Sequence, residues 1–151
     1  MVTLKNAFQA AKRSILLVVI FGLLFLLLTA FLPEFAIVAA LSIPINFFLY
    51  LYAGYTATRK MKQSVMTGGA AGALASLVSG ILLLLLQIIF LFAGLTPVTD
   101  MLGVENTSIL EVGLTTATLG IVVAGGITAL VFSIAVNFIV GLMGGYMGQK
   151  M

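Results

Sequence analysis

Four stretches of this chain run for at least 18 residues without a charged side chain: 14–33, 35–58, 63–99 and 112–149. An α-helix rises about 1.5 Å per residue, so roughly 20 residues cross a hydrocarbon core about 30 Å thick. Soluble domains rarely contain such stretches because about a quarter of their residues are charged, whereas here 7% are charged and 62% are hydrophobic. We therefore predict an all-α integral membrane four-helix bundle in a single transmembrane domain (1–151), with spans at about 14–33, 36–58, 66–94 and 118–146.

The charged residues fall on alternate sides of these four spans. The basic residues lie before the first span, between the second and third, and after the fourth: Lys5, Lys12, Arg13, Arg59, Lys60, Lys62 and Lys150. The acidic residues lie only in the two other connections: Glu34, Asp100, Glu105 and Glu111. The positive-inside rule then predicts a protein of the cell membrane with both termini in the cytoplasm and the acidic loops outside. Membrane lipid, and not nucleic acid, is the expected partner of this charge.

Five of the basic residues are predicted to contact lipid headgroups at the inner surface: Lys12, Arg13, Arg59, Lys60 and Lys62. Each contributes about 1 kcal/mol near an anionic surface. Residues 1–13 place apolar and basic side chains at helical spacing, which is typical of an amphipathic helix on the inner leaflet; a frayed basic terminus is the alternative interpretation.

A segment of the second span is repeated in the fourth. SIPINFFLYLYAGY (Ser42 to Tyr55) and SIAVNFIVGLMGGY (Ser133 to Tyr146) share seven of fourteen residues without a gap. Apolar composition explains matches of Ile or Leu, but not the recurrence of Asn, Gly and Tyr in register. We interpret the chain as two tandem helical-hairpin repeats, 1–62 and 63–151, related by a pseudo-two-fold axis along the membrane normal.

The repeat places Asn46 and Asn137 at the same depth, about 20 Å from the basic boundary. Across the pseudo-two-fold axis the two amides are expected to converge, with Ser42 and Ser133 nearby. Two interpretations are open: an interhelical hydrogen bond worth about 0.6–2 kcal/mol, or a polar site or narrow path for a solute. Gln87 is a lone amide, for which a contact with a neighbouring helix is expected.

Small residues recur every four positions in the third and fourth spans: Gly68, Gly72, Ser76 and Gly80, and then Gly125, Ala129, Ser133, Asn137, Gly141 and Gly145. Such a glycine zipper lets helix backbones approach closely in lipid. The longer row predicts that the fourth span is the most buried helix.

Local signals complete the prediction. Pro44 is expected to kink the second span, after which Tyr50, Tyr52 and Tyr55 approach the inner surface. In the outer loop, 95–117, Ser108 and Glu111 fit a capping box that starts a short helix at Ile109, and Asn106 begins an N-x-S acceptor triplet for glycosylation.

Catalytic chemistry has little support in the sequence. The chain contains no Cys and no His, and no acidic or basic residue lies inside a span. Metal centres, nucleophilic catalysis and proton relays depend on those residues. We therefore expect no catalytic residue, no cofactor and no metal site, and the chain is not expected to be an enzyme.

A Gly-Tyr pair closing a span, a basic turn and a following GGAAGALASLVSG segment resemble small four-span membrane proteins of uncharacterised prokaryotic families, archaeal ones included. The resemblance implies a four-span membrane fold and carries no active site. We expect a non-enzymatic membrane protein with a structural or interaction role, associating with a second copy or with another membrane protein. The alternatives are a small channel or facilitator for an uncharged or weakly polar solute, and a protein that binds lipid or a hydrophobic ligand.

Overall fold

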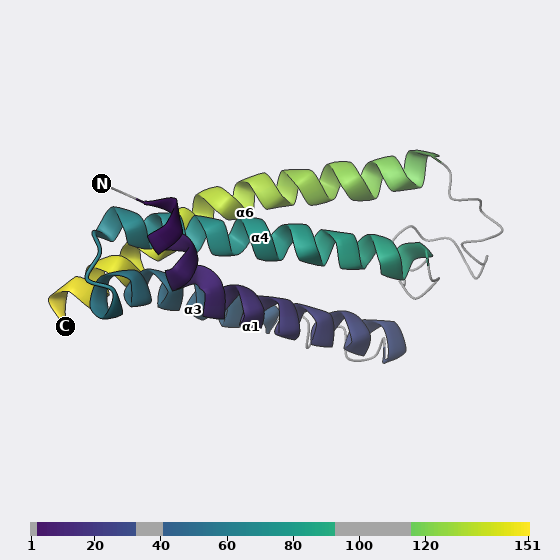
Figure 1. Ribbon diagram of the computed structural model, residues 1–151. Helices are drawn as coiled ribbons and strands as arrows, with labels where there is room; N and C mark the ends of the chain where they lie inside the picture. The colour runs from purple at the N-terminus through teal and green to yellow at the C-terminus, as the bar shows by residue number, and fades with distance from the viewer. Residues whose placement is uncertain (1–2, 33–40, 93–115) are drawn as a thin grey trace.

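The computed structural model describes residues 3–32, 41–92 and 116–151, and within these residues the chain is helical, with no strand. The order is α1 (Leu4–Phe31), α3 (Ser42–Tyr55), the π-helical turn η2 (Thr56–Lys60), α4 (Val65–Phe92) and α6 (Thr116–Lys150) (Figure 1). Three helices, α1, α4 and α6, are long and apolar enough to cross a membrane, which fits a membrane protein. Part of the predicted second span lies outside the described residues, so its crossing stays a prediction.

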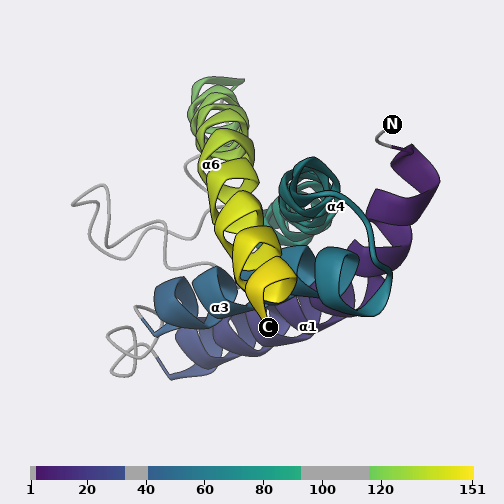
Figure 2. The ribbon, with the colours of Figure 1, turned by 90° about the vertical axis from the view of Figure 1, so that its left-hand side faces the viewer.

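The helices alternate in direction, and the two termini lie at the same end of the bundle (Figure 1). We call this end, where α1 begins and where η2 and α6 finish, the basic end, and the opposite one the far end. The helices lie close together at the basic end and spread apart towards the far end (Figures 1 and 2). The packing that holds the bundle is therefore concentrated near the basic end.

A tight turn at the basic end joins η2 to α4. Met61 N–H donates to the carbonyl of Thr56 at 3.2 Å, the wide spacing of a π-helix. Lys62 then adopts a left-handed conformation with φ of 52°, which reverses the chain. Ser64 caps α4, because its Oγ accepts from the N–H of Thr67 at 3.3 Å.

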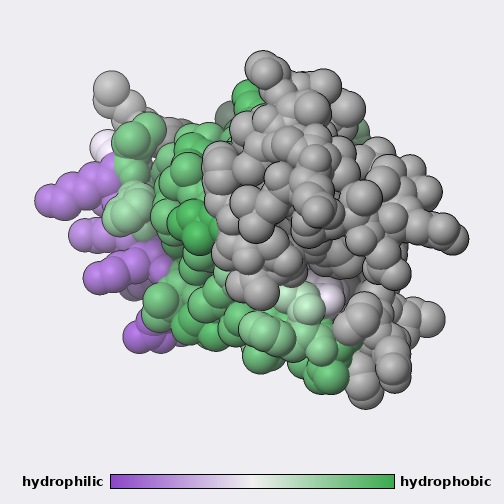
Figure 3. All heavy atoms as spheres, turned by 90° about the vertical axis from the view of Figure 1, so that its right-hand side faces the viewer, coloured by the Kyte–Doolittle hydropathy of each residue, from purple (hydrophilic) through white to green (hydrophobic). Residues whose placement is uncertain are grey.

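The N-terminal part of α1 projects sideways from the bundle (Figure 2). It is continuous with the rest of α1, and its buried stripe consists of small residues, Ala7, Ala10, Ala11 and Ser14, each no more than 2% exposed. Leu4 and Phe8, two of the apolar residues of the predicted amphipathic face, are instead exposed. Viewed from the far end, hydrophilic side chains extend to one side, and the surface next to them is largely hydrophobic (Figure 3).

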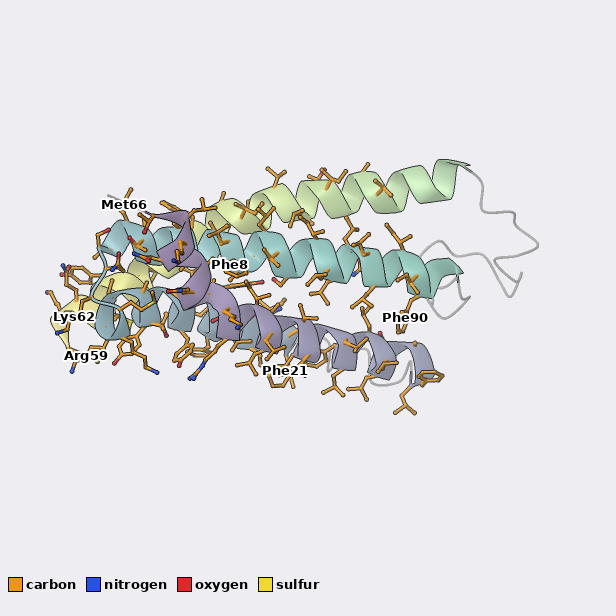
Figure 4. The ribbon with its side chains drawn as sticks, in the orientation of Figure 1. Phe8, Phe21, Arg59, Lys62, Met66 and Phe90 are labelled. Atoms are coloured by element: carbon orange, nitrogen blue, oxygen red, sulfur yellow. The ribbon has the colours of Figure 1, made fainter. Side chains whose placement is uncertain are left out.

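The most buried of the three long helices is α4, so the prediction that the fourth span is the most buried was wrong. In its most apolar stretch 22% of the residues are buried, against 11% in α6. The helix α4 is more buried because it packs against three other helices, α1, α3 and α6. Its Phe90, near the far end, lies between α4 and α1 (Figure 4). The far half of α6 instead exposes large side chains such as Val131 and Phe132.

Glycines bring three helices into backbone contact near the basic end. A Cβ added to Gly54 of α3 would collide with the carbonyl oxygen of Gly141 in α6. A Cβ on Gly141 would lie 2.5 Å from the carbonyl oxygen of Gly68 and 3.1 Å from Cα of Gly72, both in α4. We call Gly54, Gly68, Gly72 and Gly141 the glycine junction. Since any side chain here would push backbones apart, the close approach of the helices depends on glycine.

Some predictions concern residues outside the described part of the chain. They are the capping box at Ser108 and Glu111, the Asn106 triplet, the short helix from Ile109, and the placement of the four acidic residues. Pro44 lies in the first turn of α3, where a proline costs no helical hydrogen bond. The kink predicted there depends on residues 33–40, which are not described.

Candidate functional site

A hydrogen-bonded polar cluster links α4 to α6. Asn137 of α6 donates from Nδ2 to Oγ of Ser133 at 2.9 Å and to Oγ of Ser76 at 3.2 Å. The two serine hydroxyls lie 2.8 Å apart, within hydrogen-bond distance. Asn137 is 8% exposed, and the donors of its amide are satisfied by side chains of the protein rather than by water.

A second pair links α3 to α4. The hydroxyl of Tyr50 lies 3.3 Å from Oγ of Ser79, and Ser79 in turn donates to the carbonyl of Ala75 at 2.6 Å. Since that bond uses the serine proton, the tyrosine must be the donor in the first pair. Tyr50, Ser76, Ser79, Ser133 and Asn137 together form what we call the polar layer.

A cavity of about 240 Å³, the polar cavity, opens between α3, α4 and α6 and reaches the polar layer at Tyr50, Ser76 and Ser133. Its other polar lining groups are the carboxamides of Asn46 and Gln87. The remaining wall is apolar or bare backbone: Leu83, Leu84, Leu130, Gly80, Gly126 and Ala129. One water needs only about 10–15 Å³ of such space, so the cavity has room for several waters or a small solute.

A side chamber of about 200 Å³ adjoins the polar cavity. Asn46, Leu83 and Gln87 line both spaces and separate them. The side chamber is completed by α1 and by Ser42 at the start of α3. The side chains of Asn46 and Gln87 thus border both spaces.

Asn46 has an unmet requirement for a hydrogen bond. Its Oδ1 is fully buried, yet it accepts no hydrogen bond from the protein. An acceptor left unpaired in this way costs about 1–3 kcal/mol. The buried hydroxyls of Ser14 and Thr56 also lack partners, but neither residue lines the polar cavity. Because Asn46 lines the polar cavity, a rotation of its side chain that turns Oδ1 into the cavity would let a molecule with a donor group remove this cost.

The predicted Asn46–Asn137 hydrogen bond is not formed. In the described residues, Asn137 bonds to Ser76 and Ser133 instead, and Oδ1 of Asn46 is unpaired. The two repeat segments do meet, because Gly54 packs on Gly141. However, α3 and α6 cross there and separate towards the far end (Figure 2). At the depth of the asparagines the polar cavity lies between the two helices.

The glycine rows pack over part of their length. In α4, Gly68 and Gly72 face the backbone of α6, and Gly80 faces Leu130. In α6, Gly145 approaches Val65 at the start of α4, with a would-be Cβ 3.2 Å from its carbonyl oxygen. Gly125 is different, because a Cβ there would meet no atom within 4 Å, and Ala129 is likewise exposed. The far part of the α6 row therefore does not serve packing within the described bundle.

The residues predicted to contact lipid headgroups lie at or near the basic end, Arg59 and Lys62 at its tip (Figure 4). Lys60 lies over the ring of Tyr52, with Nζ 5.5 Å from the centroid, and also donates to its hydroxyl at 3.2 Å. Lys150 stacks similarly on Tyr146 at 4.8 Å. Lys12 and Arg13, on the projecting part of α1, are exposed. These cations are available to an anionic surface.

Sequence reasoning missed the role of Tyr50 and Ser79. The sequence predicts that Tyr50 approaches the inner membrane surface together with Tyr52 and Tyr55. In the structure Tyr50 is buried in the bundle, 7% exposed, with its hydroxyl against Ser79. A sequence signal did exist. Tyr50 lies one turn beyond Asn46 on the same face of its helix, so the two polar side chains mark one continuous strip of α3.

The layer and the cavity present amides and hydroxyls, which donate and accept hydrogen bonds without ionising near neutral pH. Such groups bind and orient polar molecules. Comparison of the chain with protein-family models, with curated proteins and with solved structures finds no match in any of the three.

Proposed function

We propose that this chain is a non-enzymatic integral membrane protein with a structural or interaction role, inserted by four spans with its basic end in the cytoplasm. The observation that carries the proposal is the use of glycine. The glycine junction joins α3, α4 and α6 by backbone contact, while Gly125 leaves bare backbone on the exposed side of α6. In lipid, exposed backbone of this kind favours association with another helix.

The charge distribution supports the proposed orientation. Every basic residue precedes the first predicted span, follows the fourth or lies between the second and third, and the described ones lie at the basic end, including the exposed Lys12, Arg13 and Arg59. The negative surface potential of a cytoplasmic leaflet attracts such residues. We infer that anionic lipid is the first partner of this end.

The interaction role is tested by the association of the purified full-length protein in mild detergent, measured by sedimentation. Gly125→Leu fills the bare backbone on α6 and is expected to weaken self-association. Gly120→Leu is the matched control: a Cβ at Gly120 also meets no atom within 4 Å, but five residues rotate it by about 140° around the helix. Equal association of wild type and both variants would contradict a contact between copies at Gly125.

A second candidate function, a facilitator for a small uncharged solute, is favoured by the polar cavity with its unpaired Asn46. In this conformation the cavity ends at the polar layer, and the glycine junction lies beyond it, so passage would require the helices to move. Liposomes containing the protein and placed in a glycerol gradient distinguish the two functions. The interaction role predicts swelling no faster than in protein-free liposomes, whereas facilitation predicts faster swelling that Asn46→Leu slows.

A further inference from the structure

The polar cavity contains a set of hydrogen-bonding groups that the packing of the bundle does not use. Asn46 has an unpaired acceptor, Oδ1, which a rotation of the side chain would turn into the cavity. Gln87 lines the same space from α4, where its side chain is exposed. Tyr50 donates its proton to Ser79, which leaves its oxygen free to accept. Polar groups of two helices, Asn46 and Tyr50 of α3 and Gln87 of α4, therefore border one open pocket.

The residues that line the polar cavity also restrict the charge that a bound ligand can carry. Among the residues that the structure describes, no charged side chain lines the polar cavity or the side chamber. An ion in such a site would lose its hydration without gaining a counter-ion, at a large cost in free energy. A neutral molecule loses much less, and one with an N–H or O–H group gains a bond to Asn46.

The volume of the polar cavity and the chemistry of its walls restrict the class of ligand further. The volume of about 240 Å³ is smaller than the 300–1,000 Å³ typical of pockets for drug-sized ligands. Leu83, Leu84 and Leu130 form an apolar wall beside the carboxamides. A fitting molecule is therefore small and has two parts, a polar group facing Asn46 and Gln87 and a short hydrocarbon part against the leucines.

We propose that the polar cavity is a binding site for a small uncharged molecule that carries an N–H or O–H donor and a short apolar group, held between Asn46 of α3 and Gln87 of α4. This inference goes beyond the interaction role and does not require passage across the membrane. The polar layer is the floor of the site, since Tyr50, Ser76 and Ser133 both line the cavity and belong to that layer.

Three probes of nearly equal shape test the proposal. Butanamide is neutral and has N–H donors, 2-pentanone replaces its NH₂ group by a methyl group, and butanoate carries a charge and no donor. The chain has no cysteine, so Ala129→Cys introduces a single thiol at the rim of the cavity, where Ala129 both lines the cavity and is exposed. The full-length variant in lipid nanodiscs is labelled with the small neutral reagent 2-hydroxyethyl methanethiosulfonate, and the labelling rate is measured with each probe.

Butanamide is expected to slow the labelling, by about twofold at the concentration that half-saturates the site. At that concentration, 2-pentanone and butanoate are expected to leave the rate unchanged. Met151→Cys is the control for effects of the probes on the reagent, because this terminal residue is 69% exposed at the basic end. Its labelling rate is expected to be the same with every probe.

The second variant combines Ala129→Cys with Asn46→Leu. It removes the unpaired acceptor and is expected to abolish protection by butanamide while raising thermal stability, which shows that the bundle is folded. Equal protection by butanamide and 2-pentanone would overturn the proposal, because it would mean an apolar cavity without hydrogen-bond recognition. Failure of the thiol to react, absence of protection, or protection that survives Asn46→Leu would also overturn it. The assay uses no solute gradient and does not measure association, so none of these outcomes alters the tests of the proposed function.

Discussion

The glycine junction makes a quantitative prediction for Gly141→Ala. The added methyl group would lie 2.5 Å from the carbonyl oxygen of Gly68 and 3.1 Å from the backbone N and Cα of Gly72. A Cβ atom is in ordinary van der Waals contact at 3.4–4 Å, so α6 must move away from α4 by at least about 0.9 Å. The flexible end of a side chain could avoid the methyl group, but the backbone of α4 cannot.

The magnitude follows from the dispersion energy of the interface. A gap of 0.5–1 Å removes about a quarter to a half of each atom pair's attraction of roughly 0.1–0.2 kcal/mol. If the interface contains about forty such atom pairs, as many as one buried leucine makes, their summed loss of attraction is about 2 kcal/mol. This loss agrees with the 1–3 kcal/mol that is typical of overpacked cores. We expect Gly141→Ala to lower the free energy of unfolding by about this amount.

Gly125→Ala is the matched control, because it makes the same chemical change in the same helix where a Cβ meets no atom within 4 Å. Replacing Gly by Ala raises helix propensity equally at both positions, so the difference between the variants reports the contact alone. The chain has no Trp, so reversible unfolding in mixed micelles is followed by far-ultraviolet circular dichroism. Unfolding free energies within about 0.5 kcal/mol of each other would refute the close backbone approach at Gly141.

Two further predictions concern the polar layer and are tested by the same unfolding measurement. The asparagines of the two repeats should respond with opposite signs: Asn137→Leu loses two hydrogen bonds and is expected to destabilise by about 1–2 kcal/mol, whereas Asn46→Leu removes an unpaired buried acceptor and is expected to stabilise. Equal effects would contradict the placement of the two amides. Tyr50→Phe removes the bond to Ser79 and is expected to cost about 0.6 kcal/mol. Tyr55→Phe is its control, because in the described residues the Tyr55 hydroxyl makes no hydrogen bond; an equal loss in both variants would argue against the Tyr50 bond.

The helices themselves were largely predictable, because a membrane leaves the chain few choices. Backbone groups in lipid must bond within their own segment, so an uncharged stretch of sufficient length predicts a helix. The third predicted span, 66–94, overlaps α4 (Val65–Phe92), and the fourth, 118–146, overlaps α6 (Thr116–Lys150). The bounds of the membrane crossings themselves stay predictions.

The direction in which each side chain points was harder to predict, and the glycine row of α6 shows why. Residues four apart are displaced by about 40° around a helix, so five such steps turn the row by about 200°. Gly125 and Gly145 therefore lie on nearly opposite sides of α6. This explains why Gly145 packs near Val65 while Gly125 has no neighbour within 4 Å.

The candidate site was predicted in part. The sequence singled out five polar residues: Asn46, Asn137, Ser42, Ser133 and Gln87. Three of them, Asn46, Ser133 and Gln87, line the polar cavity, and Ser42 lines the side chamber. It did not show that Asn137 is held by Ser76 and Ser133, because a repeat indicates equal depth and says nothing about the angle at which two helices cross. The separation of α3 and α6 beyond the glycine junction is a property of packing in three dimensions.

The tightest packing lies at one end of the bundle. If α6 tilts, the pivot of that tilt is therefore its contact at Gly141. Ser133 and Gly126, which line the cavity, lie about 12 and 22 Å from that pivot along the helix axis. A tilt of only about 5° therefore displaces them by roughly 1 and 2 Å, a large part of a water diameter. Motion too slight to separate the glycines thus suffices to set how much the cavity can hold.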